Sequence, residues 1–199
     1  YSDADADKPI EERSIFGDAT EVGLLRFAGK FIDPPARRAA FPKVFEIPFS
    51  SMTKWHLTVH KKPEGGLFML MKGAPERVWK HCRDIRIADH SLPMNRDWEE
   101  RFQAAYELFA KSGQRVLAFA RLDLPPEFTE DYEFERDPPN IPLDQMTFMG
   151  LLSMMDPPKR GVKKAVAACR TAGIQVVMVT GDHPLTAEAI ARQIGLISG

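Results

Sequence analysis

The sequence has little cysteine and no long apolar run, and each absence narrows the class of protein. Its two cysteines, Cys82 and Cys169, lie far apart and form no CxxC pair, so we expect a reducing compartment and no disulfide framework. No apolar run approaches the ~20 residues that span a bilayer, and no signal peptide is visible. Since the chain begins with Tyr1 rather than Met, we expect a soluble piece of a longer protein.

The sequence also lacks a large excess of positive or negative residues, and it lacks the common catalytic motifs. The net charge is −1, which gives no reason to expect nucleic acid as a partner. There is no GxxxxGK[ST] phosphate loop, GxGxxG, HExxH or GxSxG, which disfavours P-loop NTPases, classical dinucleotide folds, zincins and serine hydrolases. The five histidines are scattered without ligand spacing, so no metal site is expected.

What is present is a globular composition, 44% hydrophobic and 28% charged over 199 residues. After a polar lead-in over 1–14, Asp18 or Thr20 caps a predicted helix that Asp33-Pro34-Pro35 ends. Its apolar side would carry Val22, Leu25 and Phe27. Strand-like runs follow over 43–49, 55–60 and 67–72, with a hairpin turn over 61–66 and a helix starting at Pro75 that carries Val78, Trp79 and Cys82.

Further along, an aromatic stripe predicts an amphipathic helix that ends at Gly113. The stripe consists of Trp98, Phe102, Ala105 and Phe109. Strands are predicted over 115–120 and 147–155, separated by a surface excursion over 123–145 that is rich in proline and acidic residues. This order of elements favours an α+β domain, an antiparallel sheet flanked by helices, over residues 1–155.

The pattern changes after Asp156-Pro157-Pro158, which suits a stiff hinge, although it could equally be a simple helix start. A helix over 159–172 with Val162, Val166 and Cys169 inward, a buried-type strand over 176–179 and a second helix from Pro184 predict a partial parallel α/β segment over 159–199. The loop 180–184 joins strand to helix, where α/β folds bind phosphate; an ordinary turn is the alternative.

Two further groups of residues suit a purine nucleotide. Lys72-Gly73 ends a buried-type strand, where the ammonium could reach a cleft and glycine would let a flat group approach, although a solvated lysine is the plain alternative. A neighbouring run places Phe49 for stacking near the cations Lys54 and His56, and Arg115 starts another strand.

Taken together, these segments resemble the cytoplasmic catalytic region of P-type cation-transporting ATPases, of the type II branch and nearer to sodium/potassium-type α subunits. The matching motifs follow the family's order over nearly the whole chain: Gly17-Asp18-Ala19-Thr20-Glu21, Glu46-Ile47-Pro48-Phe49-Ser50, Lys72-Gly73-Ala74-Pro75-Glu76, Gln114-Arg115-Val116-Leu117, Asp156-Pro157-Pro158 and 178–184. The resemblance implies a nucleotide-binding domain followed by part of a haloacid-dehalogenase-like phosphorylation domain.

The resemblance also assigns site residues. It implies ATP binding by Glu21, Phe49, Lys54, His56, Lys72, Gly73, Arg115 and Leu117, with Phe49 stacked on adenine and Arg115 near the phosphates. Asp156 would lie at the hinge near the ribose, and Thr180, Gly181 and Asp182 in the phosphate site. The chain departs from the family at His56, where close relatives carry glutamine, and at Lys159, where arginine is usual.

The family's phosphorylated Asp-Lys-Thr-Gly segment and its magnesium-supporting Gly-Asp-Gly-x-Asn-Asp segment are both absent. We therefore expect no catalytic residue here, and ATP binding without turnover. The parent would lie in a membrane, with this part on the cytoplasmic side. It would use ATP and Mg²⁺ to transport a cation, together with its remaining phosphorylation, actuator and membrane domains.

The strand over 176–179 would lack its usual neighbour, so residues after about 158 are expected to be poorly ordered, rearranged or paired with another copy. Two other functions remain open at this point. They are a non-enzymatic nucleotide-binding regulatory module and a fragment of a haloacid-dehalogenase-type phosphatase.

Overall fold

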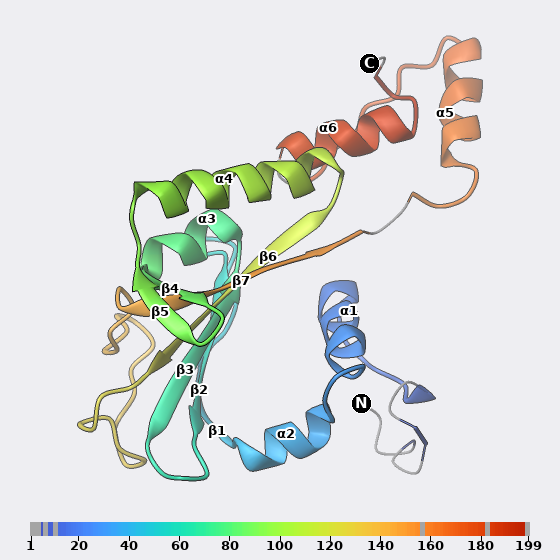
Figure 1. Ribbon diagram of the computed structural model, residues 1–199. Helices are drawn as coiled ribbons and strands as arrows, with labels where there is room; N and C mark the ends of the chain where they lie inside the picture. Colours follow the sequence, from blue (N-terminus) through green and yellow to red (C-terminus); the bar gives the residue numbers. More distant parts are fainter. Residues whose placement is uncertain (1–4, 6–7, 10–11, 156–157, 182–183, 198–199) are drawn as a thin grey trace.

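A mixed β-sheet forms the centre of the molecule in the computed structural model, which describes residues 5, 8–9, 12–155, 158–181 and 184–197 (Figure 1). Within these residues the sheet has seven strands in the order β1-β2-β3-β6-β7-β4-β5. The strands are β1 (Lys43–Ile47), β2 (Trp55–Lys61), β3 (Leu67–Gly73), β4 (Cys82–Ile87), β5 (His90–Pro93), β6 (Arg115–Asp123) and β7 (Met146–Met154).

The sheet is not purely antiparallel, which corrects the fold class expected from the sequence. All neighbouring strands run antiparallel except β4 and β7, which pair in parallel from Cys82 opposite Met146 to Ile85 opposite Phe148. The excursion over 124–145 forms none of the named helices or strands, as predicted, and it returns the chain to the edge of β6. The next strand therefore lies between β6 and β4, where its direction matches that of β4.

The β4–β5 hairpin is absent from the sequence-based prediction because its burial pattern is weak. The expected helix from Pro75 ends early, as α3 (Pro75–Val78) and a 3₁₀ turn, η3 (Trp79–His81), and Cys82 already belongs to β4. Of the residues in β4 only Ile85 is buried, and β5 is exposed throughout. A strand pair with one buried side chain lacks the alternation by which strands are recognised.

Two short helices precede the sheet. Asp18 caps α1 (Ala19–Ala28) as predicted, since its carboxylate accepts the Thr20 and Glu21 backbone N–H groups. Asp33 caps a second helix, α2 (Pro34–Ala40), where the sequence suggested only a break. No residue of α1 is buried; Val22 and Leu25 are half-buried, whereas Phe27 is exposed, which corrects the predicted apolar side.

The core lies between the sheet and α4 (Arg96–Lys111), which Asn95 caps. The predicted aromatic stripe faces it, and Phe102 stacks on Trp79 with ring centroids 4.1 Å apart. The fully buried side chains come mainly from β2, β3 and the start of β7: Leu57, Val59, Leu67, Met69, Met71 and Met146, with Val78 of α3. This rigid base supports the ends of β2, β3 and β6, where the site lies.

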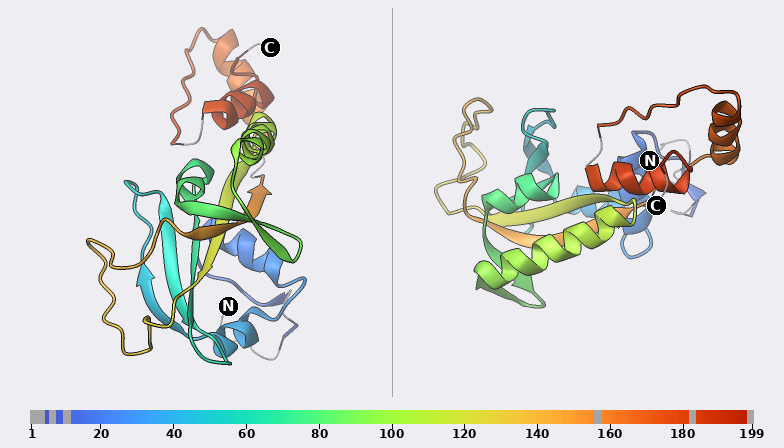
Figure 2. Two further views of the ribbon diagram at one scale, coloured as in Figure 1. Left: turned by 60° about the vertical axis from the view of Figure 1, so that its left-hand side comes forward. Right: turned by 90° about the horizontal axis from the view of Figure 1, so that it is seen from above.

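Beyond the sheet come α5 (Val162–Thr171) and α6 (Pro184–Gln193), both at predicted positions. Figures 1 and 2 show α6 lying against the end of α4, where Thr186 Oγ1 donates to the Gln114 carbonyl at 3.3 Å. The predicted strand over 176–179 does not form, and the Val177 and Val179 side chains are 71% and 94% exposed. No described strand lies alongside this segment, so its apolar side chains have no sheet to join.

Candidate functional site

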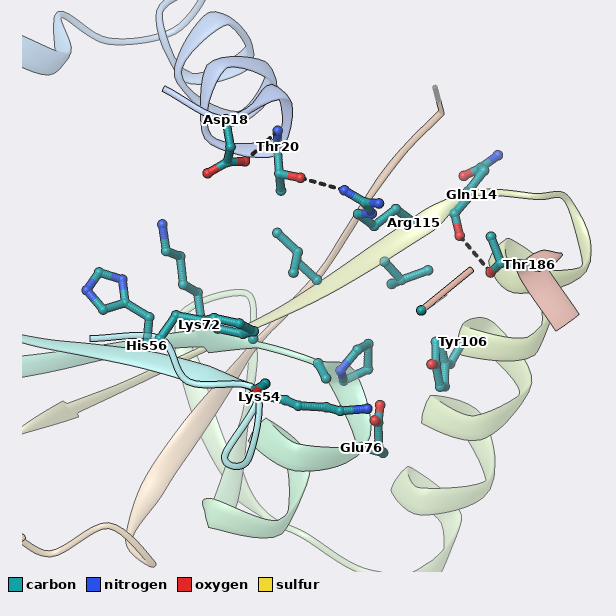
Figure 3. A pocket seen from close by; sticks show the side chains of 18 of the residues that line it. Asp18, Thr20, Lys54, His56, Lys72, Glu76, Tyr106, Gln114, Arg115 and Thr186 are labelled. Carbon is teal, nitrogen blue, oxygen red and sulfur yellow. Dashed lines mark hydrogen bonds between the residues drawn. The ribbon is translucent and has the colours of Figure 1, made fainter. Parts of the chain in front are cut away.

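A cavity of about 660 Å³ opens where the ends of β2, β3 and β6 meet the first turn of α1 (Figure 3). All eight residues assigned to ATP by resemblance line it: Glu21, Phe49, Lys54, His56, Lys72, Gly73, Arg115 and Leu117. These residues come from five separate segments of the chain, so the fold brings them together. A cavity of this size falls in the range that holds drug-sized ligands.

Strand register decides which side chains of β2 and β3 face the cavity. His56 lies directly opposite Lys72, and Trp55 opposite Gly73. Successive side chains of a strand point to opposite faces, so Trp55 and Leu57 enter the core while His56 turns to the cavity. Lys54, which precedes β2, lines the cavity as well.

The first turn of α1 is joined to the sheet across the cavity by polar contacts. Lys72 Nζ, on β3, lies 2.5 and 2.6 Å from the two carboxylate oxygens of Glu21. Arg115, at the start of β6, donates to Thr20 Oγ1 at 2.9 Å (Figure 3). No side chain of α1 is buried, and these two contacts join its first turn to β3 and β6.

The carboxylate of Glu46 lies next to His56, the residue opposite Lys72. His56 Nε2 lies 2.8 Å from Glu46 Oε1 on β1, and Lys43 bonds the other oxygen of the same carboxylate. The hydrogen bonds from Lys43, and then from His56, lower the pKa of Glu46. The carboxylate is therefore ionised at neutral pH and acts only as an acceptor.

Apolar surface for a flat ring is present as well. Phe49, in the loop after β1, exposes 63% of its surface at the cavity, and Leu117 lines it half-buried. An exposed ring beside a cavity offers a face on which an aromatic ligand could stack. The aromatic and cationic requirements inferred from the sequence are thus met in one place.

The other end of the cavity contains residues that sequence reasoning missed. Tyr106 of α4 and Glu76 of α3 line it, with Gln114 and Thr186 (Figure 3). Burial, followed by the neighbouring Glu76 carboxylate, raises the pKa of Tyr106 to about 12. Glu76 could have been found, because it ends the Lys72–Glu76 motif; Tyr106 resembles any other core residue of an amphipathic helix.

The residues assigned to the phosphate site and hinge are only partly described. Gly181 lines the cavity and Thr180 precedes it in the chain. Asp156 and Asp182 lie outside the described residues. In the part of the chain that the structure describes, no three His, Cys, Asp or Glu side chains form a cluster suited to a metal ion.

Comparison with known proteins identifies the family of the chain. Residues 2–161 match the family described as the P-type ATPase cytoplasmic domain N. The chain belongs to the P-type ATPase family. Within the described residues, no helix is both long and apolar enough to cross a membrane.

Named P-type ATPases match over almost the entire chain. A sodium/potassium-transporting ATPase subunit alpha-A from Artemia franciscana is 44% identical over 193 residues, and the human subunit alpha-4 is 43% identical. A potassium-transporting ATPase alpha chain 2 from Cavia porcellus is 45% identical over 195 residues. These alignments cover 96% of this chain but 19% of each relative, so the chain spans about a fifth of their length.

Proposed function

We propose that the cavity binds ATP and that the chain is the nucleotide-binding part of a P-type ATPase that couples ATP hydrolysis to cation transport. The observation that carries this proposal is the convergence of Phe49, Lys72 and Arg115 on one cavity. Family membership and the ion-transporting relatives support it independently.

The arrangement suggests how ATP would lie. The base would stack on Phe49 and contact Leu117, because these supply the apolar surface. The phosphates would extend toward Arg115 and Lys54, whose charges complement them. ATP binding would either break the hydrogen bond from Arg115 to Thr20 or leave it in place. Arg115 can hold both partners because a guanidinium carries five N–H donors.

We also propose which domains this chain contains and which parts of phosphoryl transfer depend on the rest of the parent protein. Residues 1–155 form the nucleotide-binding domain, 156–158 a hinge near the ribose at Asp156, and 159–199 part of the phosphorylation domain. Thr180, Gly181 and Asp182 would approach the phosphates when the parent closes. Phosphoryl transfer needs a carboxylate nucleophile in line with the γ-phosphate, and Mg²⁺ to neutralise charge. Both would come from parts of the parent outside this sequence.

Titration with ATP tests the proposal. In isothermal calorimetry and amide NMR, ATP should bind with modest affinity and shift the signals of Phe49, Lys72 and Arg115. Phe49→Ala should weaken binding roughly tenfold, because stacking on one base is worth about 1–3 kcal/mol. Phe31→Ala is the matched control, since Phe31 is 72% exposed and does not line the cavity.

Two results would overturn this reading. Unmoved amide signals at saturating ATP would remove the nucleotide site. Release of phosphate by the isolated chain would instead indicate a phosphatase or a complete ATPase, since we expect ATP to stay intact.

A further inference from the structure

A second cavity, of about 250 Å³, lies between α4 and the neighbouring strands β4 and β7. The described residues that line it all differ from those that line the cavity assigned to ATP. Its buried lining includes Ile85 of β4 and Phe148 of β7, which are neighbours in the parallel strand pair. Trp98 and Phe109 of α4 line it half-buried, so the cavity is open to water.

Aromatic side chains dominate this lining. They are Trp79, Trp98, Phe102, Phe109 and Phe148. Apolar surface that remains in contact with water is stabilised when an apolar group covers it. Since drug-sized ligands occupy cavities of about 300–1,000 Å³, this cavity suits a somewhat smaller molecule.

Among the described residues that line the cavity, Arg101 of α4 carries the only charge. Its guanidinium lies over the Trp98 ring, 5.5 Å from the centroid, and forms no ion pair or hydrogen bond with a described residue. Other cations of α4 are paired: Arg96 with Glu100 and Lys111 with Glu107, each at 3.1 Å. Arg101 therefore leaves its N–H donors available beside an apolar cavity.

We propose that this cavity binds small aliphatic monocarboxylates, with the alkyl chain among the aromatic rings and the carboxylate on Arg101. A guanidinium matches a carboxylate geometrically, because two parallel N–H groups meet its two oxygens. One guanidinium also balances the single charge of a carboxylate, whereas a phosphate carries nearly two. The site is separate from the proposed ATP cavity, so it does not depend on the proposed function.

The test compares three ligands with the same alkyl chain on the full chain: octanoate, 1-octanol and octylammonium. In ¹H–¹⁵N NMR titrations, the indole N–H signals of Trp79 and Trp98 should shift saturably. The signal of Trp55 is the internal reference, since Trp55 is buried in the core and does not line this cavity. Octanoate should bind about fivefold more tightly than octanol, the upper end for an exposed ion pair, and octylammonium should bind most weakly.

Two pairs of variants separate the contribution of the charge from that of the apolar lining. Arg101→Gln should reduce the preference for octanoate over octanol to within about 1.5-fold and leave octanol binding unchanged. Arg96→Gln removes the same charge from α4 outside the cavity, so it should keep the wild-type preference.

Ala105→Leu should fill the cavity from α4 and remove saturable binding of both ligands, because Ala105 lines it. Ala104→Leu is its matched control, since Ala104 is exposed on the same helix and does not line the cavity. It should bind both ligands as the wild type does.

Four outcomes would overturn the inference. They are the absence of a saturable shift with octanoate, equal affinity for octanoate and octanol, a preference that survives in Arg101→Gln, and binding that survives in Ala105→Leu. Indole signals of Trp79 and Trp98 that move with protein concentration alone would show that a second copy covers the cavity, which would also overturn it.

Discussion

A Cβ atom on Gly73 would lie 2.4 Å from the carbonyl oxygen of Lys54, closer than such atoms can approach. Lys54 itself has a left-handed backbone, with φ of 59°, and its carbonyl accepts the Ala74 N–H at 2.9 Å. The end of β3 thus lies directly against Lys54 and Trp55 at the start of β2. Both Lys54 and Lys72 line the cavity next to this crossing.

Gly73→Ala should therefore push β2 and β3 apart at the cavity. We expect a loss of about 1–3 kcal/mol in the free energy of unfolding, typical of overpacking against atoms that cannot move aside. Urea denaturation measures it. Gly23→Ala is the control, because a Cβ there would meet only Met154 Sδ at 3.9 Å, and alanine in α1 should be neutral or stabilise by up to about 1 kcal/mol. Equal stability of Gly73→Ala and wild type would contradict this account.

This position shows what sequence can and cannot predict at the site. The sequence marks Gly73 as a place where a flat ligand could approach, and Gly73 does line the cavity. The close approach of the Lys54 backbone to the same residue is a second constraint that the sequence does not indicate. Their places at strand ends and in the motifs mark Lys54, Lys72 and Arg115 in the sequence, and all three line the cavity. The register between the consecutive strands β1 and β2, which brings Glu46 next to His56, cannot be predicted from the residue pattern of either strand.

The same contrast applies to the fold: strands with a clear burial pattern can be predicted from the sequence, and strands without one cannot. Strands with buried alternate residues, such as β2 and β3, were predicted within a residue or two at each end. The β4–β5 hairpin was missed because burial there is slight. The opposite error occurred at 176–179, where strongly apolar residues predict a strand that needs a neighbour to form.

Removing the Lys72 partner on α1 should loosen that helix without unfolding the domain. For Glu21→Gln we expect the free energy of unfolding to change by less than about 1 kcal/mol, since the Glu21 side chain is 43% exposed. Backbone amides of α1 should exchange with deuterium faster, because α1 has no buried side chain to hold it.

Glu100→Gln serves as the control for this change, as Glu100 forms an exposed pair with Arg96 on α4. It should leave exchange in α1 unchanged. Undiminished protection of α1 in Glu21→Gln would show that the Lys72 contact does not anchor the helix.

The stacked rings beneath α4 should be the most sensitive part of the core. Phe102 is 8% exposed and packs on Trp79 and, edge-on, on Phe148. Phe102→Ala should cost about 3–5 kcal/mol of unfolding free energy. Leu108→Ala on the same helix should stay within about 0.5 kcal/mol, because Leu108 is 65% exposed. Comparable costs for the two variants would place the core elsewhere.

Acid should weaken the contact between β1 and β2. Because the pKa of Glu46 is lowered in the fold, by Lys43 first and then His56, its contribution is fully present above the ordinary glutamate pKa of about 4.3. It is lost as the pH falls through the lowered value. The stability difference between wild type and Glu46→Gln, measured by urea denaturation, should be about 1 kcal/mol or less at pH 7 and should shrink toward pH 3. A difference that is constant across this range would contradict the assignment.

Thiol labelling gives a test of the fold at the point where η3 passes into β4. The Cys82 thiol donates to the Val78 carbonyl at 3.2 Å, and burial raises its pKa to about 12. Since the thiolate is the reactive form, only ~10⁻⁴ of Cys82 would be reactive at pH 8. In Cys169→Ser, Ellman's reagent should therefore react very slowly with the native protein and rapidly in urea, and the native rate should rise about tenfold per pH unit. Cys82→Ser, which retains the half-buried Cys169, should react faster. Immediate labelling of native Cys82 would mean that this residue is not enclosed between α3 and the sheet.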